Sequence, residues 1–309
     1  MPSPRLLVVH PTIAGESYRD TGDQALAWRL LAGFEDVSWR AGLCSSREVC
    51  DLAAEEVSAA TLIIISPFRC LGSSGNQPAF LSRVATAHKR ILASLGPVED
   101  PWYEKRFTSP IRFDAVFDLG FVSQADRHRV SDVPYHFVFN GLTSEEERIL
   151  TNLSYSEGRC IPWALVGDRN QTNFDLLAKL LEHQVDPGGF CFLHPRLHAK
   201  NKAHRMLSGL GLSKVLSKTS YYLWASDYPF AYYESLRFVY ALLAGAVPCK
   251  IDSCYLWENV EIPNIFPSVR SFQTKVQAEG YSSMYSSARE FYVPKGRLAE
   301  HLEKALHLV

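Results

Sequence analysis

The sequence predicts an α/β protein of two Rossmann-like, doubly wound parallel-sheet domains that face a cleft. Short, almost unbroken apolar runs recur along the chain, as expected for strands that are buried on both faces. Helical patterns separate these runs, and such alternation is typical of parallel sheets covered by helices. The chain has 309 residues, which suits two domains of about 150 residues each.

In the first half, the apolar runs "RLLVVH", "TLIIIS", "FDAVFDL" and "YHFVFN" predict strands at residues 5–10, 61–66, 113–119 and 135–140. Helical patterns predict helices at residues 22–33, 46–59, 78–94 and 144–152. The stretch 95–112 has no clear period, so we expect an excursion within the first domain.

In the second half, "IPWALVG", "GFCFLH", "SYYLWAS" and "AVPCKID" predict strands at residues 161–167, 189–194, 220–226 and 246–252. The predicted helices cover residues 171–183, 200–210, 232–244 and 296–308. A short polar segment at 153–160 precedes a fresh strand–loop–helix unit. We therefore predict one domain at 1–155 and a second at 156–309.

Composition and charge narrow the class of protein. The chain is 47% hydrophobic and 21% charged, as in soluble globular proteins, and its net charge is -1. This balance provides no global basic field, so we expect no nucleic-acid partner and no anionic membrane surface. Seven cysteines without a C-x-x-C pair or zinc-like spacing indicate reduced core thiols and a cytoplasmic location. No segment reaches the ~18 apolar residues of a membrane span.

The loop after the first strand is a candidate catalytic region, because ligands of open α/β sheets bind beyond the carboxyl ends of the strands. His10, Glu16 and Asp20 are our candidates for a general base there, and Asp23 is a further carboxylate in the same loop. The alternative interpretation is that these carboxylates cap the next helix or are solvated charges.

Two loops of the second half could hold an anionic ligand. Gly167 follows the first strand of that half and would let a ligand approach the backbone, with Arg169 close by to contact a phosphate. The segment 194–205 is basic and contains no acidic residue, so it suits a pyrophosphate, although a solvated helix start is the alternative. Its basic side chains are Arg196, Lys200, Lys202 and Arg205. Its histidines have no cysteine or carboxylate partners, so we predict no metal site.

A third loop leads into the helix predicted at 232–244. Glu234 and Arg237 lie near the start of this helix, just beyond a strand end. Glu234 could accept sugar or ribose hydroxyls there, and Arg237 could pair with a phosphate. A surface ion pair at a spacing of three residues is the alternative. Gly245 is expected to stop the helix, and Pro248 begins the next strand, where its missing N–H matters least.

The stretch "RFVYALLAGAVPCKI" resembles the second domain of GT-B type nucleotide-sugar glycosyltransferases, through Arg237, Ala241, Gly245 and Pro248. "ALLAGAVP" looks especially like α-1,3-fucosyltransferases, and exostosin-like and spore-maturation-protein-like transferases share the arginine spacing. The resemblance is specific over 219–270 and loose over 160–309. Retaining members carry a carboxylate where this chain has Tyr240, so the resemblance implies an inverting reaction.

The resemblance implies that the second domain holds a nucleotide-diphosphate sugar and that the first holds a carbohydrate, peptide or small-molecule acceptor. No cofactor and no metal are implied, because no Asp-x-Asp motif is present. The implied donor-binding residues are Gly167, Arg169, Arg196, Lys200, Lys202, Arg205, Asp227, Tyr233, Glu234 and Arg237. Two alternatives remain: a sugar-nucleotide epimerase or hydrolase on the same scaffold, or a non-catalytic GT-B-like binding protein.

Overall fold

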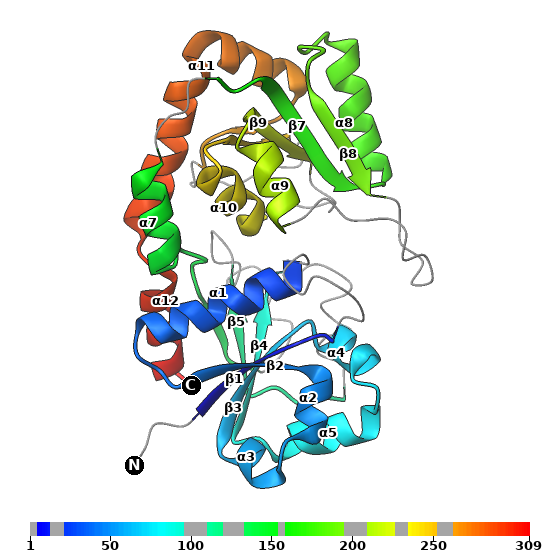
Figure 1. Ribbon diagram of the computed structural model, residues 1–309, viewed down its shortest axis with the longest axis vertical. Helices are drawn as coiled ribbons and strands as arrows, with labels where there is room; N and C mark the ends of the chain where they lie inside the picture. The colour runs from blue at the N-terminus through cyan, green and yellow to red at the C-terminus, as the bar shows by residue number, and fades with distance from the viewer. Residues whose placement is uncertain are drawn as a thin grey trace. The chain divides into compact units, whose positions relative to one another are not determined.

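The computed structural model describes residues 5–12, 22–95, 110–119, 133–153, 158–194, 209–225, 234–251 and 262–309 (Figure 1). The chain divides into two compact units. Unit 1 comprises Met1–Glu145 and Lys295–Val309, and unit 2 comprises Glu146–Pro294. The predicted division near residue 155 left the last helix with the second domain, whereas the structure packs it into unit 1.

Within its described residues, unit 1 contains a six-stranded parallel sheet in the order β2-β1-β3-β4-β5-β6. Its strands are β1 (Arg5–His10), β2 (Ala41–Ser45), β3 (Ala60–Ile65), β4 (Lys89–Ser94), β5 (Ala115–Asp118) and β6 (Tyr135–Phe137). The chain passes from β1 to β2 on one side and then crosses to β3 on the other. The strand order therefore reverses between β1 and β3, and such switch points are where open α/β sheets bind ligands.

Alternating side chains of the unit 1 strands build two apolar layers. Leu6 and Val8 of β1 belong to one core with α1 (Gly22–Asp36) and α12 (Leu298–His307), while Leu7 and Val9 belong to the other. The second core is closed by α2 (Ser46–Asp51), α3 (Ala54–Ser58), α4 (Pro67–Ser73) and α5 (Gln77–Thr86). Helices on both faces explain why these strands read as unbroken apolar runs.

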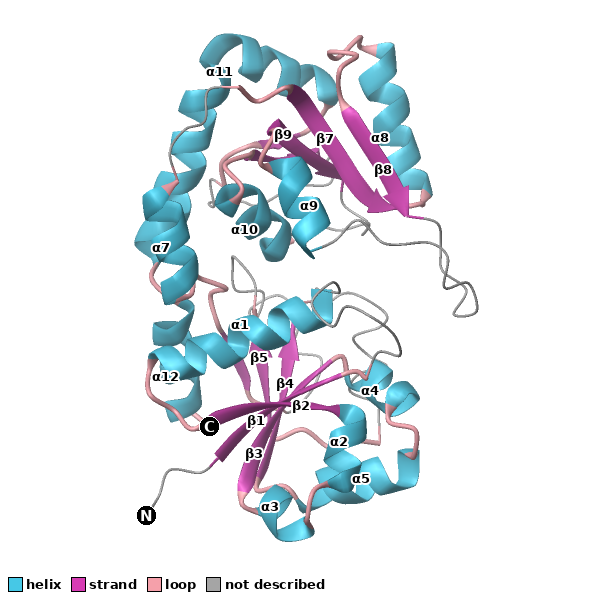
Figure 2. Ribbon diagram, viewed as in Figure 1, coloured by secondary structure: helices cyan, strands magenta, loops and turns pink. Residues whose placement is uncertain are grey.

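Unit 2 repeats this plan with five described strands, all parallel, in the order β11-β10-β9-β7-β8 (Figure 2). They are β7 (Ile161–Asp168), β8 (Phe190–His194), β9 (Thr219–Ala225), β10 (Val247–Ile251) and β11 (Ile265–Phe266). The helices assigned to this half are α7 (Ser144–Asn152), α8 (Gln171–Glu182), α9 (Gly209–Leu216), α10 (Ser235–Leu243) and α11 (Val269–Tyr292), followed by a 3₁₀ turn (Val293–Lys295). The switch point of unit 2 lies between β7 and β9.

Gly245 ends α10 as predicted. Its φ is +73°, its N–H donates to the carbonyl of Leu242 at 3.0 Å, and the N–H of Ala246 donates to the carbonyl of Ala241 at 2.8 Å. This pair of bonds is a Schellman motif, which favours glycine because a side chain is strained at positive φ. The turn leads directly from the end of α10 into the start of β10. Because α10 and β10 then run in opposite directions, the first turn of α10 and the last residues of β10 lie at the same edge of the sheet.

The predicted helix at 78–94 was wrong in its second half. The helix α5 ends at Thr86, and Lys89–Ser94 forms the central strand β4. The N–H of His88 bonds to the carbonyl of Ala60, which begins the pairing of this segment with β3. The strand β2 and the segment α11, which Gly280 breaks with a non-helical φ of 72°, were not predicted. Within the described residues, no helix is both long and apolar enough to cross a membrane.

Candidate functional site

In unit 2, the candidate site lies at the carboxyl ends of β7, β9 and β10, where the first turn of α10 contacts the sheet. In the strand register, Leu165 lies level with Leu223, and Trp224 lies level with Lys250. Glu234 is the N-cap residue of α10 but makes no side-chain cap hydrogen bond. Its carboxylate is used elsewhere, as the following contacts show.

Arg237 joins the first turn of α10 to two strands. Its Nη1 donates to the backbone carbonyl of Val166 in β7 at 2.8 Å and to the hydroxyl of Tyr222 in β9 at 2.8 Å. Tyr222 is 1% exposed, while Arg237 is half-buried. The guanidinium of Arg237 therefore lies between β7 and β9, at the switch point of unit 2.

Glu234, the N-cap residue of α10, contacts side chains of β9 and β10. Its Oε2 accepts a hydrogen bond from Trp224 Nε1 at 3.0 Å and lies 3.3 Å from Lys250 Nζ. The Lys250 side chain has no exposed surface, whereas the Glu234 side chain is 17% exposed. The alternative interpretation, a surface ion pair with Arg237, is not what holds Glu234. The partner is a buried lysine of the neighbouring strand, so Glu234 lies at the boundary between the core and the surface.

Gly167 and Arg169 lie at the end of β7 and in the turn before α8. A Cβ on Gly167 would lie 2.8 Å from Asn173 Nδ2, so the glycine makes room for a buried asparagine of α8. The guanidinium of Arg169 stands over the ring of Phe174, 5.7 Å from its centroid, and Arg169 is exposed. Asn170 caps α8 by accepting from the N–H of Asn173. This turn leaves a solvent-facing cation near a helix start, which suits an anion.

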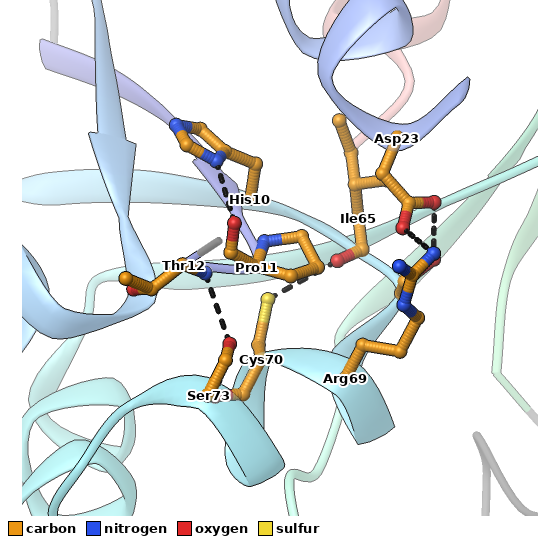
Figure 3. A network of polar contacts seen from close by, with 9 residues as sticks. His10, Pro11, Thr12, Asp23, Ile65, Arg69, Cys70 and Ser73 are labelled. Carbon is orange, nitrogen blue, oxygen red and sulfur yellow. Dashed lines mark hydrogen bonds and ion pairs between the residues drawn. The ribbon is translucent and has the colours of Figure 1, made fainter. Parts of the chain in front are cut away.

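In unit 1, the polar groups gather where β1 ends, and Figure 3 shows them from close by. His10 is 2% exposed, and its Nδ1 donates to the carbonyl of Pro11 at 3.0 Å. In the neutral ring this bond leaves the lone pair on Nε2, which is the form a general base needs. The N–H of Thr12 donates to the hydroxyls of Ser46 at 3.1 Å and Ser73 at 2.9 Å. These bonds tie the end of β1 to α2 and α4.

Asp23 lies in the first turn of α1, beside the end of β3. Its Oδ1 accepts from the hydroxyl of Ser66 at 2.7 Å, and its Oδ2 pairs with Arg69 of α4 (Figure 3). Ser66 has a φ of 49°, a left-handed conformation that is uncommon for residues other than glycine and is found at functional sites. Asp23 is thus a positioned carboxylate at the switch point of unit 1, and sequence reasoning considered it without its two partners.

The thiol nearest this region is not a nucleophile. Cys70 is fully buried, and its Sγ donates to the carbonyl of Ile65 at 3.2 Å (Figure 3). Burial raises the pKa of the Cys70 thiol well above its ordinary range, with Asp23 adding to the shift. The reactive form of a cysteine is the thiolate, so Cys70 serves packing rather than chemistry.

Several predicted site residues lie outside the described part of the chain. These are Glu16, Asp20, Arg196, Lys200, Lys202, Arg205, Asp227 and Tyr233. Sequence reasoning missed Tyr222, Trp224, Lys250, Ser66 and Arg69. Lys250 carried a usable signal, because a charge inside an apolar strand needs a buried partner. Among the described residues, no group of three or more His, Cys, Asp or Glu could hold a metal ion.

No protein-family model and no curated protein sequence matches the chain. Solved structures do match it over almost its full length. An alpha-glucosyltransferase in complex with UDP-glucose and DNA containing an abasic site has a TM-score of 0.60 at 10% identity, covering 96% of this chain and 95% of its own. T4 phage BGT in complex with UDP and Mn²⁺ has a TM-score of 0.54 at 13% identity, covering 97% and 99%.

A third structure, an alpha1,3-fucosyltransferase, has a TM-score of 0.38 at 10% identity over 81% of this chain and 69% of its own. That score is too low to support an argument. The class of fold is defined by the first two likenesses and by the two parallel sheets of this chain. The five strands of the unit 2 sheet follow the same order as the first five strands of the unit 1 sheet. The chain has the two-domain α/β fold of GT-B glycosyltransferases, as the sequence predicted.

Proposed function

We propose that the chain is a glycosyltransferase that moves a sugar from a nucleotide-diphosphate sugar to a carbohydrate, peptide or small-molecule acceptor. The observation that carries this proposal is the likeness of the whole chain, in both units, to two structures bound to UDP-glucose and to UDP. A binding module could share one such unit, but both units of a GT-B transferase are matched here. Uridine diphosphate sugars are the first donors to test.

In this proposal the donor binds to unit 2 at the carboxyl ends of β7 and β9. Arg237 and Arg169 would contact the diphosphate, because guanidinium groups match phosphate oxygens in geometry and charge. Glu234 would accept hydrogen bonds from hydroxyl groups of the donor. The basic residues predicted at 196–205 would add further phosphate contacts. This arrangement follows the rule that ligands bind at the switch point of an open sheet.

The acceptor would bind to unit 1, and the reaction would be inverting. A base takes the proton of an acceptor hydroxyl as its oxygen forms the bond to the anomeric carbon, while the bond from that carbon to the diphosphate breaks. The negative charge moves to the leaving diphosphate, where positive side chains stabilise it. His10, Glu16 and Asp20 are the candidates for the base. For His10, the Nδ1 bond to Pro11 fixes the neutral tautomer with its lone pair on Nε2, which is the form that a base needs.

We propose that the reaction needs no metal ion. T4 phage BGT was solved with Mn²⁺, so the assay below compares transfer with and without a metal ion. The described residues supply no cluster of metal-binding side chains, so no step is assigned to a metal here. DNA is tested as an acceptor as well, because the alpha-glucosyltransferase was solved with DNA. The net charge of -1 favours acceptors without a polyanionic backbone.

A product assay tests the proposed function. The protein is incubated with radiolabelled UDP-sugars and pooled saccharide, peptide, small-molecule and duplex DNA acceptors, with EDTA or Mn²⁺. We expect acceptor-dependent transfer in EDTA, with inverted anomeric configuration by NMR, and loss of at least 100-fold in rate for His10→Ala if His10 is the base. Release of free sugar, or a new sugar epimer without any acceptor, would instead identify a hydrolase or an epimerase. Binding without turnover of any donor would identify a non-catalytic protein.

A further inference from the structure

Lys250 is a fully buried lysine that forms an ion pair within the candidate site. Its side chain, on the core strand β10, has no exposed surface, and its Nζ lies 3.3 Å from Glu234 Oε2. Trp224, which is 1% exposed, donates its indole N–H to the same oxygen at 3.0 Å. A hydrogen bond from β9 and an ion pair from the neighbouring strand β10 thus converge on one carboxylate oxygen.

The pair has no evident value for stability alone. Burying an ammonium group is costly, and a buried ion pair is often no more stable than apolar residues of similar volume. A methionine would fill the place of Lys250 between β9 and α10. The better-supported use of such a pair is to specify one conformation, and here the conformation it specifies is that of Glu234.

The second carboxylate oxygen of Glu234 is left for another use. Among the residues that the structure describes, none donates a hydrogen bond to Oε1, and the side chain is 17% exposed. Glu234 occupies the N-cap position of α10 but does not cap the helix. Holding Oε2 from two directions keeps the carboxylate in this position rather than in a capping role. Because Oε2 is already engaged, Oε1 is the oxygen of this partly exposed side chain that is left to accept from a ligand.

We propose that Lys250 is a positioning residue: it orients Glu234 so that Oε1 accepts hydrogen bonds from the adjacent hydroxyl groups of a ribose in the nucleotide donor. This inference rests on the proposed function. An ionised carboxylate is an acceptor only, so it suits paired hydroxyl donors and gives nothing to a nucleotide that lacks them. Lys250 would act only through Glu234, without touching the donor.

The test compares the affinity of UDP with that of 2′,3′-dideoxy-UDP, measured by isothermal titration calorimetry. Hydrogen bonds to a charged group contribute about 1.5–3 kcal/mol, which corresponds to a preference of about 10- to 150-fold for UDP in the unchanged protein. In Lys250→Met we expect this preference to fall to about threefold or less, while the affinity for dideoxy-UDP changes by no more than about twofold. Glu234→Gln should lose the preference as well.

Two further variants keep the test decisive. Trp224→Phe removes one of the two donors but keeps a buried aromatic ring and the paired charge of Lys250, and it should lose part of the preference. If Lys250→Met does not fold, Trp224→Phe tests whether holding Oε2 of Glu234 is needed for the preference for UDP. Lys275→Met is the matched control, because it breaks an exposed ion pair with Glu279 at 2.7 Å and should leave the preference unchanged.

The outcomes separate this inference from the proposed function. If the unchanged protein prefers UDP and a folded Lys250→Met keeps the full preference, the positioning role is wrong and the donor site stands. If Lys250→Met does not fold, a full preference in Trp224→Phe has the same meaning. Equal binding of UDP and dideoxy-UDP by the unchanged protein would overturn the ribose contact alone. If neither nucleotide binds, the donor site and this inference both fail.

Discussion

Replacing Leu302 by alanine is expected to lower the free energy of unfolding of unit 1 by about 3 kcal/mol. Leu302 lies in α12, has no exposed surface, and belongs to the same core as Leu30 and Phe34 of α1. A Cβ on Gly33 would lie 2.8 Å from Leu302 Cδ1, which shows how closely the two helices pack. Removing the leucine side chain leaves a cavity that these rigid neighbours cannot fill.

Hydrogen exchange locates this effect within the chain. The amides of β1 and β3 should exchange faster in Leu302→Ala, while those of β7 and β9 keep their rates. Leu308→Ala is the control, because Leu308 is 71% exposed and its truncation should change stability by less than about 0.5 kcal/mol. Faster exchange in β7 and β9 instead would show that the last helix belongs with unit 2.

Replacing Gly189 by alanine is expected to destabilise unit 2 by about 2–3 kcal/mol. The new Cβ would lie 1.9 Å from Trp163 Cε2, far closer than two non-bonded carbon atoms can approach. Trp163 is 5% exposed and donates its indole N–H to the carbonyl of Asp186 at 2.8 Å. The ring would have to move, which breaks this hydrogen bond and separates β7 from the start of β8.

The adjacent glycine provides a matched control for this clash. A Cβ on Gly188 would have Asp186 Oδ1 as its nearest neighbour, at 3.2 Å, and Pro162 beyond 3.4 Å. The free energy of unfolding of Gly188→Ala should therefore lie within about 1 kcal/mol of that of the unchanged protein, whereas that of Gly189→Ala should be lower by more than this. Calorimetric unfolding of both variants measures the difference, and equal midpoints would contradict the packing of Trp163 described here.

The buried strands could be predicted because helices cover both faces of each sheet, which makes the strands apolar throughout. β2 and β4 were missed for local reasons. β2 reads "AGLCS" and lies at the sheet edge, where small, half-buried residues give no apolar run. β4 begins with Lys89 and Arg90, and Arg90 pairs with Asp114, so its charged start extended the preceding helical pattern. α11 was missed because Gly280 interrupts its period with a positive φ.

The placement of Glu234 and Arg237 could be predicted, because a helix that starts after a parallel strand must present its first turn at the carboxyl edge. Their partners could not. Lys250 is 16 residues beyond Glu234, and only the pairing of β10 with β9 brings it beside Trp224. The same holds for Asp23, whose partners Ser66 and Arg69 come from the next strand–helix connection. Such contacts depend on strand order, which a single sequence does not reveal.

The most direct test of the account is a thermal-shift panel with UDP, GDP, ADP, CMP and dTDP. At a concentration 100-fold above its dissociation constant, a ligand of the native state stabilises by about 2.7 kcal/mol, which raises the unfolding midpoint of a unit the size of unit 2 by about 5–10 °C. We expect one nucleoside diphosphate, UDP first, to produce this shift in the unchanged protein. Arg237→Ala and Glu234→Ala should each lose most of it, relative to their own midpoints without ligand. No shift with any of the five nucleotides would contradict a donor site in unit 2.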